Sequence, residues 1–422
     1  MQKNDEKTQK NVEKVIKKVK KMWKFPILMD GATGTVLITA GMKQDQQVAE
    51  YVLNNKNVLL KAQKNYISAG SQLLMTSTFG VNSVKYPDNF RELNRELFAI
   101  TKQAVSESGE NVLIAGEMSP SGLFLEPYGD ATFEDIYKVF YDQAQVLAEC
   151  GADVIALSTM YSLPETRIAV LAAKDACGLD VLASMTVDEH GKTMSGNDIL
   201  ACIAVLQAVG ASAVGMNCSN GPIEMSKLVE KSYDIANIPL MVKPNAGADV
   251  SKYLETDVFS EYMVKMFKNG ANILGGCCGT DSSYIQQIKK DIFNDEFINK
   301  YKKNVKNIDD NDFYILSSEK NVFKINKSLN YVETMNCADF IEEMTDLEFD
   351  DSVIYVKIDD ENDTEEFLMN VFMADLPIFA VCKKFELAEM LAKKYCGILI
   401  MNGNYFDELQ NKILRSFGTI LV

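Results

Sequence analysis

Eight short apolar runs, each followed by a segment long enough for a helix, occupy the first two thirds of this 422-residue chain. The runs cover residues 26–29, 72–75, 112–115, 153–157, 181–185, 212–215, 239–242 and 272–274. Strands that alternate with helices predict a parallel sheet, because each helix returns the chain to the end of the sheet where the previous strand began. Eight such units over this length are typical of a (β/α)8 barrel (TIM barrel), and a doubly wound open sheet is the alternative.

A cluster of polar or small residues follows each apolar run. These clusters are residues 30–35, 76–80, 116–117, 158–160, 186, 217–218, 244–247 and 277–278. The carboxyl ends of all strands meet at one mouth of a (β/α)8 barrel, and active sites in this fold form there. The position of the clusters therefore favours the barrel over the open sheet and predicts one site at its mouth.

Three cysteines fall within these clusters: Cys218, Cys277 and Cys278. Adjacent cysteines bond each other only through a strained ring, so three thiolates that converge on one point indicate a soft cation, and zinc is expected. Glycines on both sides of the 277–278 pair allow the backbone to bend so that neighbouring side chains aim at one point. Three thiolates leave the fourth position of a tetrahedral site open to a substrate. The alternative is three buried, inert cysteines.

Charge and composition exclude several classes of protein. The chain has 59 acidic and 43 basic residues and a net charge of −16, which argues against nucleic acid as a partner. No apolar run is long enough to span a membrane and no signal peptide opens the chain, so we expect a cytoplasmic protein. Nine cysteines without the spacing of a disulfide framework fit a reducing compartment. The single histidine, His190, lies in a predicted exposed turn and is not expected to be catalytic.

The chain divides into four predicted parts. Residues 1–25 carry apolar side chains at helical spacing among lysines, which predicts an amphipathic helix. Residues 26–295 form the predicted barrel, and residues 296–312 are a predicted charged linker. Residues 313–422 alternate further apolar runs with helical segments, which predicts a small α/β domain with a parallel sheet. This last part contains no histidine that could ligate the cobalt of a cobalamin.

Four motifs resemble the homocysteine S-methyltransferase family and occur in the order in which that family carries them. They are Asp30-Gly31-Ala32-Thr33-Gly34-Thr35, Gly215-Met216-Asn217-Cys218, Pro244-Asn245-Ala246-Gly247 and Gly275-Gly276-Cys277-Cys278-Gly279-Thr280. The likeness is strongest to the homocysteine-binding barrel of cobalamin-dependent methionine synthase. It implies a zinc-bearing barrel in which Cys218, Cys277 and Cys278 are the catalytic metal ligands and the thiol of homocysteine takes the fourth position.

The resemblance also implies where the substrate binds. The loop that starts with Asp30, Gly31 and Ala32 resembles the family's substrate loop, which meets the amino-acid end of homocysteine. Further substrate contacts are expected from the polar clusters after the second, third, fourth and sixth runs, at Thr76, Ser77, Glu117, Ser158 and Asn217.

Three positions depart from the family pattern. Ser77 stands where an asparagine is usual, and Ser158 stands where a glutamate usually helps to hold the amino group of the substrate. Ser162 replaces an aspartate, whereas Glu165 is retained and is expected to be an exposed, solvated carboxylate. Because Ser158 cannot form an ion pair with an ammonium group, one expectation is that Glu117, at the end of the third run, receives the amino group together with the aspartate of the substrate loop. The alternative is that Glu117 is a partly exposed glutamate paired to a lysine.

The activity that the resemblance implies is methyl transfer to the thiol of homocysteine, which gives methionine. The donor is expected to be methylcobalamin carried by a separate corrinoid protein, because the chain shows no cobalamin site of its own. Two alternatives stay open: a related methyltransferase with another thiol acceptor or a small-molecule donor such as S-methylmethionine or betaine, and a non-catalytic zinc-binding barrel. The C-terminal part is either a shortened remnant of a second barrel or a docking module.

Overall fold

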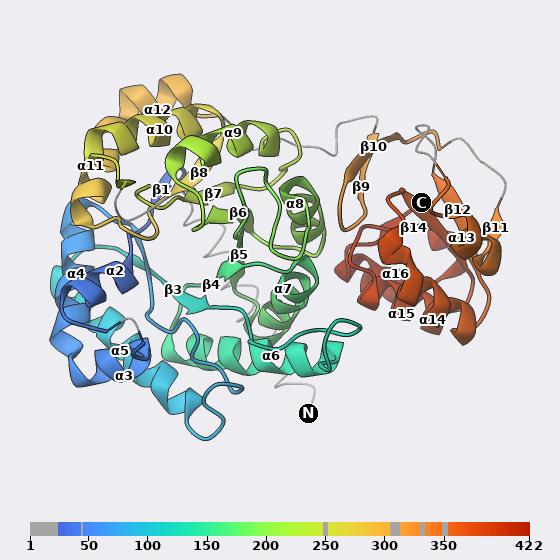
Figure 1. Cartoon of the computed structure of the whole chain (residues 1–422), viewed down its shortest axis with the longest axis horizontal. Helices are drawn as coiled ribbons and strands as arrows, with labels where there is room; N and C mark the ends of the chain where they lie inside the picture. Colours follow the sequence, from blue (N-terminus) through green and yellow to red (C-terminus); the bar gives the residue numbers. More distant parts are fainter. Residues whose placement is uncertain (1–23, 44, 248–251, 304–312, 330–333, 348–352) are drawn as a thin grey trace.

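The computed structural model describes residues 24–43, 45–247, 252–303, 313–329, 334–347 and 353–422. These residues form an eight-stranded barrel surrounded by helices and, beside it, a smaller α/β domain (Figure 1). Residues 1–23 of the predicted helix (residues 1–25) and residues 304–312 of the predicted linker (residues 296–312) lie outside the described residues. Residues 296–301, at the start of the predicted linker, instead belong to a helix. Within the described part of the chain, no helix combines the length and the apolar character needed to cross a membrane.

All eight strands of the large sheet are parallel and lie in the order β1-β8-β7-β6-β5-β4-β3-β2. They are β1 (Ile27–Leu28), β2 (Leu73–Met75), β3 (Leu113–Met118), β4 (Val154–Met160), β5 (Asp180–Met185), β6 (Ala213–Asn217), β7 (Leu240–Lys243) and β8 (Ala271–Leu274). A parallel bridge between Met29 and Leu73 joins β1 to β2, so the sheet closes on itself. The predicted (β/α)8 barrel is therefore confirmed, and each strand overlaps one of the eight predicted runs.

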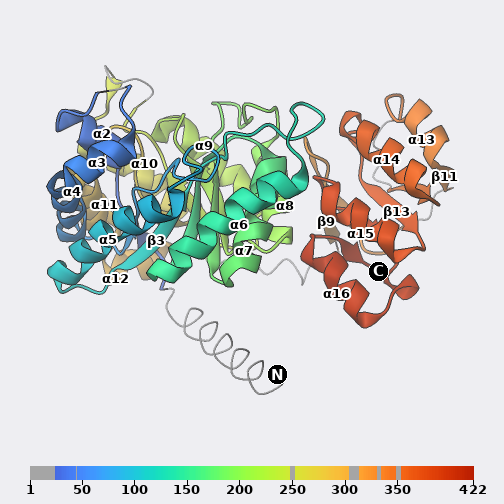
Figure 2. The same ribbon diagram turned by 90° about the horizontal axis from the view of Figure 1, so that it is seen from below.

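Helices form the outer layer of the barrel (Figure 2). They are α2 (Thr33–Thr39), α3 (Val48–Asn54), α4 (Lys56–Ala69), α5 (Phe90–Ser108), α6 (Phe133–Cys150), α7 (Leu163–Cys177), α8 (Ile199–Ala208), α9 (Pro222–Ser232), α10 (Thr256–Lys268), α11 (Ser282–Ile292) and α12 (Asp295–Tyr301). Short polar side chains set several helix starts: Thr132 forms a capping box before α6, and Asp198 and Asp281 cap α8 and α11. These caps satisfy backbone N–H groups that have no partner within the helix.

Apolar side chains fill the inside of the barrel below its mouth. This inner cluster comprises Ile27, Met29, Leu73, Met75, Ala115, Val154, Ala156, Leu182, Ala213, Met241 and Ile273. Successive strand residues point to opposite faces, so the other residues of the same strands pack outward against the helices. Because the interior is a packed core and not a pore, space for a ligand remains only at the mouth.

In the described part of the C-terminal domain, five parallel strands lie in sequential order beside a two-stranded antiparallel hairpin. The parallel strands are β11 (Met335–Asn336), β12 (Ile354–Ile358), β13 (Ile378–Cys382), β14 (Ile400–Met401) and β15 (Ile420–Leu421), and the hairpin is β9 (Phe313–Ser317) with β10 (Val322–Asn326). Between the parallel strands lie α13 (Cys337–Glu343), α14 (Glu361–Asn370), η3 (Val371–Met373), α15 (Phe385–Lys394), η4 (Gly403–Tyr405) and α16 (Glu408–Ser416). The predicted small α/β domain with a parallel sheet is confirmed, whereas the hairpin was not predicted.

Helices α13 to α16 share one apolar core with the sheet of this domain, which includes Phe340, Phe367, Leu391 and Leu414. Strands in sequential order with all their helices packed into one core are the arrangement of a barrel segment. The other side of the sheet, with Tyr355 and Phe379 stacked at 4.5 Å, belongs to the same continuous apolar core as the outer layer of the large barrel.

Candidate active site

The mouth of the barrel holds a cavity of about 290 Å³, to which seven of the eight strands contribute. One lining residue from or just after each of these strands is Asp30 (β1), Ser77 (β2), Glu117 (β3), Ser158 (β4), Asn217 (β6), Lys243 (β7) and Cys277 (β8). A cavity near 300 Å³ is at the small end of the range for ligand pockets. It therefore suits a molecule of the size of an amino acid.

Cys218, Cys277 and Cys278 converge at one side of this cavity. Their sulfur atoms all lie within 4.8 Å of one another, and the Sγ atoms of Cys218 and Cys278 are 3.8 Å apart. A tetrahedral zinc ion with Zn–S bonds of about 2.3 Å places its sulfur ligands about 3.8 Å apart, so the separation fits the donor set of such an ion. In the described part of the chain, no other group of histidine, cysteine or carboxylate side chains offers three converging ligand atoms.

The backbone on both sides of the cavity bends to bring the three thiols together. Cys218 and the residue after it, Ser219, have positive φ angles of 65° and 55°, which turn the chain sharply at the end of β6. After β8, Gly279 has a φ of 84°, and an added Cβ atom would lie 2.4 Å from the ring of Tyr253. A hydrogen bond of 2.8 Å from the Cys277 N–H group to the carbonyl of Pro244 ties this loop to the end of β7.

The three thiols influence one another's protonation. In the chain alone, the hydrogen bond with Cys218, supported by burial, raises the pKa of Cys277 to about 12. Cys218 lowers the pKa of Cys278, but Cys277 and burial outweigh this effect and raise it to about 11. The thiols therefore keep their protons at neutral pH unless a cation displaces them, as a coordinated metal does.

Asn217 is held in place beside the cysteines by several hydrogen bonds. Its Nδ2 group donates to the Oγ1 of Thr159 at 2.8 Å and approaches the sulfur of Cys277 at 3.8 Å. Its Oδ1 atom accepts hydrogen bonds from the N–H group of Thr159 at 2.8 Å and the hydroxyl of Ser184 at 2.7 Å. Asn217 thus links the end of β4 to a metal-ligand candidate.

Asp30 is occupied by partners from within the protein. Its Oδ1 atom accepts a hydrogen bond of 2.8 Å from the ammonium of Lys243, and its Oδ2 atom accepts one of 2.8 Å from the N–H group of Met75. Both charged side chains are almost completely buried. Burial alone lowers the pKa of Lys243, but the charge and hydrogen bond of Asp30 outweigh burial and raise it above its usual value. Lys243 therefore keeps its positive charge, and both side chains form part of the cavity wall.

Glu117 faces the cavity without a salt bridge within the described residues. Burial raises the pKa of its carboxyl group to about 8; Lys243 opposes this shift, Asp30 adds to it, and a hydrogen bond with Ser158 opposes it. Burial removes the water that would stabilise a negative charge on Glu117. A cationic ligand beside it would stabilise the ionised carboxylate instead. The nearby hydroxyl of Ser77 is buried without a hydrogen-bond partner and also lines the cavity.

A family model of homocysteine S-methyltransferases matches residues 27–292, which is more than half of the chain. The chain belongs to the homocysteine S-methyltransferase family. The matched range begins at β1 and ends at the last residue of α11, so it contains all eight barrel strands and every lining residue of the cavity.

Two curated relatives of the chain are methionine synthases from mycobacteria. The protein from Mycobacterium tuberculosis is 29% identical over 291 residues, which cover 63% of this chain and 24% of that protein. The protein from Mycobacterium leprae is 28% identical over 285 residues, which cover 61% of this chain and 24% of that protein. The chain thus spans about a quarter of the length of these relatives.

Solved structures of the homocysteine methyltransferase MmuM from Escherichia coli share the barrel fold. The oxidized form matches with a TM-score of 0.54 at 21% identity, and the match covers 63% of this chain and 95% of that one. The metallated form matches with a TM-score of 0.53 at 20% identity over the same shares of the two chains. At these identities the likeness concerns the fold.

The structure brings together all the predicted site residues of this methyltransferase-family chain except Thr76. The three cysteines, the substrate loop and the predicted contacts at Ser77, Glu117, Ser158 and Asn217 line the same cavity. The hydroxyl of Thr76 instead accepts a hydrogen bond from the N–H group of Glu117 and shares one with Thr78, which ties β2 to β3. His190 lies in an exposed turn and does not line the cavity, as expected.

Lys243 was missed in the sequence, although a signal was present. It ends the seventh apolar run directly before Pro244, and a lysine at the carboxyl end of a barrel strand faces the mouth of the barrel. Thr159 was also not singled out. It has a φ of 57°, a strained conformation for a β-branched residue, and β4 shifts register at this point.

The expectation for Glu165 was wrong. Its carboxylate is buried and accepts hydrogen bonds from the N–H group of Ser121 at 2.7 Å and the hydroxyl of Ser121 at 2.5 Å. Burial raises the pKa of Glu165, although the two hydrogen bonds from Ser121 oppose the shift. Glu165 therefore connects the first turn of α7 to the loop after β3.

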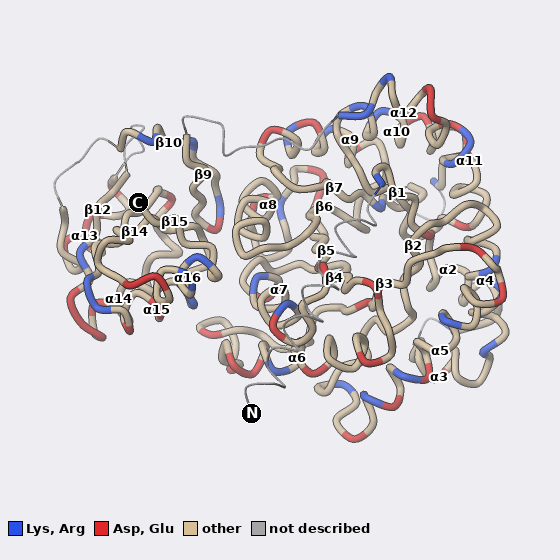
Figure 3. The backbone as a smooth tube through the Cα atoms, turned by 180° about the vertical axis from the view of Figure 1, so that it is seen from behind, with Lys and Arg blue, Asp and Glu red and all other residues tan. Residues whose placement is uncertain are grey.

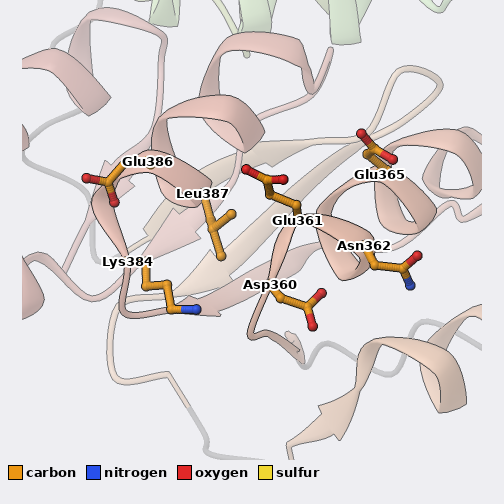
Figure 4. Close-up of a pocket in the computed structure, with 7 residues that line it drawn as sticks. All are labelled: Asp360, Glu361, Asn362, Glu365, Lys384, Glu386 and Leu387. Carbon is orange, nitrogen blue, oxygen red and sulfur yellow. The ribbon is translucent and has the colours of Figure 1, made fainter.

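A second hollow, of about 720 Å³, lies on the C-terminal domain at the starts of α14 and α15 (Figure 4). Its rim carries the carboxylates of Asp360, Glu361, Glu365 and Glu386 and the amine of Lys384. Figure 3 shows how acidic positions gather along α14. These carboxylates do not converge as metal ligands do, because within the described residues only the cysteines at the barrel mouth meet that condition.

Proposed function

We propose that this chain is a zinc-dependent methyltransferase that moves a methyl group from methylcobalamin, carried by a separate corrinoid protein, to the thiol of homocysteine and so produces methionine. The observation that carries the proposal is the convergence of Cys218, Cys277 and Cys278 in a cavity of amino-acid size. Family membership and the similarity to methionine synthases support homocysteine as the acceptor. The E. coli relative that has been solved in a metallated form supports a metal in this family.

The three cysteines are the residues that would hold the zinc ion. Bound there, zinc would keep the acceptor sulfur as a thiolate, so that no general base is needed. This suits a cavity into which the single histidine of the chain does not reach. Asn217 keeps the sulfur of Cys277 in position through its amide group, while the tight turn at Cys218 orients the first thiol.

The residues opposite the cysteines would hold the amino-acid end of the acceptor. Glu117 is the carboxylate available for the ammonium group, because Asp30 is already paired with Lys243. In the transfer step, the sulfur of the acceptor forms a bond to the methyl carbon. The bond between that carbon and the donor breaks and leaves its electron pair on the donor, and the thiol proton passes to solvent.

The methyl donor would reach the sulfur from outside the barrel. A cavity of about 290 Å³ holds a small acceptor and leaves no room for a corrinoid ring, so the donor has to approach over the mouth. The methionine synthases matched here are about four times as long as the matched segment, which leaves room for donor modules that lie outside this match. All nine cysteines are free thiols, which supports the proposed cytoplasmic location.

A second candidate function is methyl transfer to another thiol or from a small-molecule donor such as S-methylmethionine or betaine. Ser158 and the Lys243–Asp30 pair favour it, because among the described residues that line the cavity only Glu117 offers an unpaired carboxylate to an amino group. A thiol without an α-amino group would fit this wall at a smaller electrostatic cost.

The donor is tested by measuring methionine formation by the zinc-loaded full chain. A methylated corrinoid protein, free methylcobalamin, S-methylmethionine and betaine are compared at equal concentrations. We expect rapid turnover only with the corrinoid protein and slow turnover with free methylcobalamin, because a docked donor domain supplies the positioning that a free cofactor lacks. Efficient turnover of S-methylmethionine or betaine without any corrinoid would replace the proposal by the second candidate.

A further inference from the structure

Arg167 of α7 is a barrel residue whose guanidinium group lies within the C-terminal domain. It is almost completely buried, and it donates hydrogen bonds to the carbonyls of Ala392, Lys393 and Phe417. The bond to Lys393 measures 2.6 Å and the bond to Phe417 measures 2.8 Å. One side chain of the barrel therefore satisfies three backbone groups of the other domain.

The electrostatics of this contact come from helix ends. Ala392 and Lys393 lie in the last turn of α15, and Phe417 directly follows α16, so the three carbonyls carry the negative ends of two helix dipoles. Within the described residues, no carboxylate lies at ion-pair distance from Arg167. The positive charge of Arg167 is therefore compensated by the carbonyl groups of the docked domain. In return, Arg167 supplies hydrogen-bond donors to carbonyl groups at the ends of α15 and α16, which have no partner within their helices.

Apolar packing and one ion pair support the same contact. The hairpin β9–β10 packs against α8 of the barrel, and its buried residues Leu316 and Phe323 belong to the core that includes the outer layer of the barrel. The ammonium of Lys393 contacts the carboxylate of Glu134 at the start of α6. Figures 1 and 2 both show the C-terminal domain against the side of the barrel formed by α7 and α8.

Two hydrogen bonds of Asn197 connect this interface to the start of α7. The amide Nδ2 group of Asn197 donates to the carbonyl of Glu319, next to the hairpin, at 3.3 Å. Its Oδ1 atom accepts a hydrogen bond of 3.1 Å from the N–H group of Leu163, the first residue of α7. Asn197 is buried, and its bond with Leu163 is made away from water. The C-terminal domain is thus connected to the start of the helix that carries Arg167.

The end of β4 and the two residues that join it to α7 require such support. Thr159 has a φ of 57°, and a strained β-branched residue persists only where its surroundings impose the conformation. Asn217 holds Thr159 from the side of the cysteines, and the bond from Asn197 to Leu163 holds the segment from the side of the C-terminal domain. Ser158, directly before Thr159, lines the cavity.

We propose that the C-terminal domain is a fixed support for the acceptor side of the cavity and that Arg167 is the positioning residue that docks it. The segment from Ser158 to Leu163 keeps its conformation because α7 and the loop before α8 are held by the docked domain. This role assigns a function to residues that the family match does not include, since the match ends at residue 292. Its effect on the acceptor rests on the proposed methyl transfer, whereas its effect on the segment itself does not.

The test compares the full chain with its Arg167→Met and Arg167→Lys variants. Methionine fills the space of the arginine stem but leaves three buried carbonyls without donors, and lysine keeps the charge without the planar fork. The matched control is Arg91→Met on α5, where the arginine is half-exposed and contacts Glu149 at 3.5 Å. Amide hydrogen exchange, zinc content and acceptor kinetics are measured for all four proteins.

We expect Arg167→Met to speed exchange at Thr159 and Leu163 and to raise the KM for homocysteine about tenfold, with kcat within about twofold of the parent. Zinc content should not change, because the three cysteines follow β6 and β8 and none of them belongs to α7 or to the segment before it. The lysine variant should fall between the methionine variant and the parent, and Arg91→Met should match the parent. A parallel loss of zinc and uniform exchange throughout the barrel would overturn the proposal, because it would indicate general unfolding.

The Asn197→Asp variant tests the hydrogen bonds of Asn197 without removing those that Arg167 makes to the C-terminal domain. Aspartate keeps the acceptor for the Leu163 N–H group but loses the donor to the carbonyl of Glu319. Faster exchange at Thr159 with Arg167 still docked supports the connection through Asn197, whereas parent-like exchange in both Asn197→Asp and Arg167→Met excludes it. If the parent chain does not methylate homocysteine, the exchange measurements still decide the support role, and only the kinetic part fails with the proposed function.

Discussion

The ammonium of Lys243 lies 2.8 Å from the carboxylate of Asp30, and both side chains are almost completely buried at the mouth of the barrel. The two residues come from β7 and from the loop after β1, 213 positions apart in the chain. A buried pair of this kind contributes little when both partners are present, but the removal of one partner leaves an uncompensated charge. Because Asp30 is already paired with Lys243, Glu117 is left as the carboxylate that can bind the amino group of the acceptor.

The Lys243→Met substitution should therefore destabilise the protein strongly. We expect the free energy of unfolding at pH 7 to fall by about 3–5 kcal/mol, because the buried Asp30 loses its cationic partner and, among the described residues, keeps the Met75 N–H group as its hydrogen-bond donor. The combined Lys243→Met and Asp30→Asn variant should recover a large part of this loss. Urea unfolding of the two single variants and the combined variant measures the coupling.

A matched control for the Lys243 prediction is Lys192→Met. Lys192 pairs with Asp198 at 3.1 Å, but its side chain is 42% exposed, so its loss should cost about 1 kcal/mol or less. Equal destabilisation by Lys192→Met and Lys243→Met would show that burial of the Lys243–Asp30 pair has no special effect.

Zinc binding should depend on three of the nine cysteines. We expect about one zinc ion per chain and loss of most of it in Cys218→Ala, Cys277→Ala and Cys278→Ala, because a tetrahedral thiolate site is weakened by the loss of any ligand. Cys202→Ala is the matched control, since Cys202 is buried in α8 and does not belong to the group of three converging cysteines. Elemental analysis of the purified variants measures zinc, and full retention by the Cys277→Ala and Cys278→Ala variants would contradict the site.

Glu117 should determine whether the acceptor carries an amino group. If it binds the ammonium of homocysteine, Glu117→Gln should raise the KM for homocysteine about tenfold or more, because a charge-assisted hydrogen bond contributes about 1.5–3 kcal/mol. Ser158→Ala should have a small effect. The substrate control is 4-mercaptobutyrate, which keeps the thiol and the carboxylate but lacks the amine, and its kcat/KM should not respond to Glu117→Gln.

The opposite kinetic result would favour the second candidate function. A mild effect of Glu117→Gln on homocysteine, together with a kcat/KM for 4-mercaptobutyrate that equals that of homocysteine, would indicate an acceptor without an α-amino group. Tight binding of homocysteine to a variant with both Glu117→Gln and Asp30→Asn would indicate that backbone groups bind the amino-acid end of homocysteine.

The raised pKa of Glu117 predicts a defined dependence of stability on pH. Burial raises this pKa from 4.5 to about 8, so between these pH values the folded protein binds a proton that the unfolded chain has released. The contribution of Glu117 to the free energy of unfolding therefore decreases as pH rises from about 4.5 to about 8. Glu117→Gln removes this dependence, so the variant should gain stability relative to the parent as pH increases.

Urea unfolding at pH 5, 6.5 and 8 tests the dependence, with exposed Glu92→Gln on α5 as a control. The difference in unfolding free energy between Glu117→Gln and the parent should grow across the series, and the difference for Glu92→Gln should stay constant. A constant difference for Glu117→Gln would mean that the Glu117 carboxyl group titrates alike in the folded and unfolded chains.

The order of strands and the position of the site could be predicted because both depend on local features of the sequence. Each apolar run needs only its own residues to form a strand, and in a parallel barrel every strand end faces the same mouth. Cys218 and Cys277 therefore had to lie at that mouth once their runs were recognised. The parallel sheet of the C-terminal domain followed from the same alternation of runs and helical segments.

The partners of single side chains were decided only by the closed, packed structure. The Lys243–Asp30 pair depends on how β7 and the loop after β1 meet across the barrel, and the burial of Glu165 depends on the loop after β3 folding over α7. In the sequence, Arg167 looks like an ordinary helical arginine. Its guanidinium group donates a hydrogen bond to a carbonyl group 225 positions further along the chain, and this contact forms only when the second domain packs against the barrel. Local spacing sets which strands form, whereas burial and charge pairing depend on surfaces that come together only when distant segments pack.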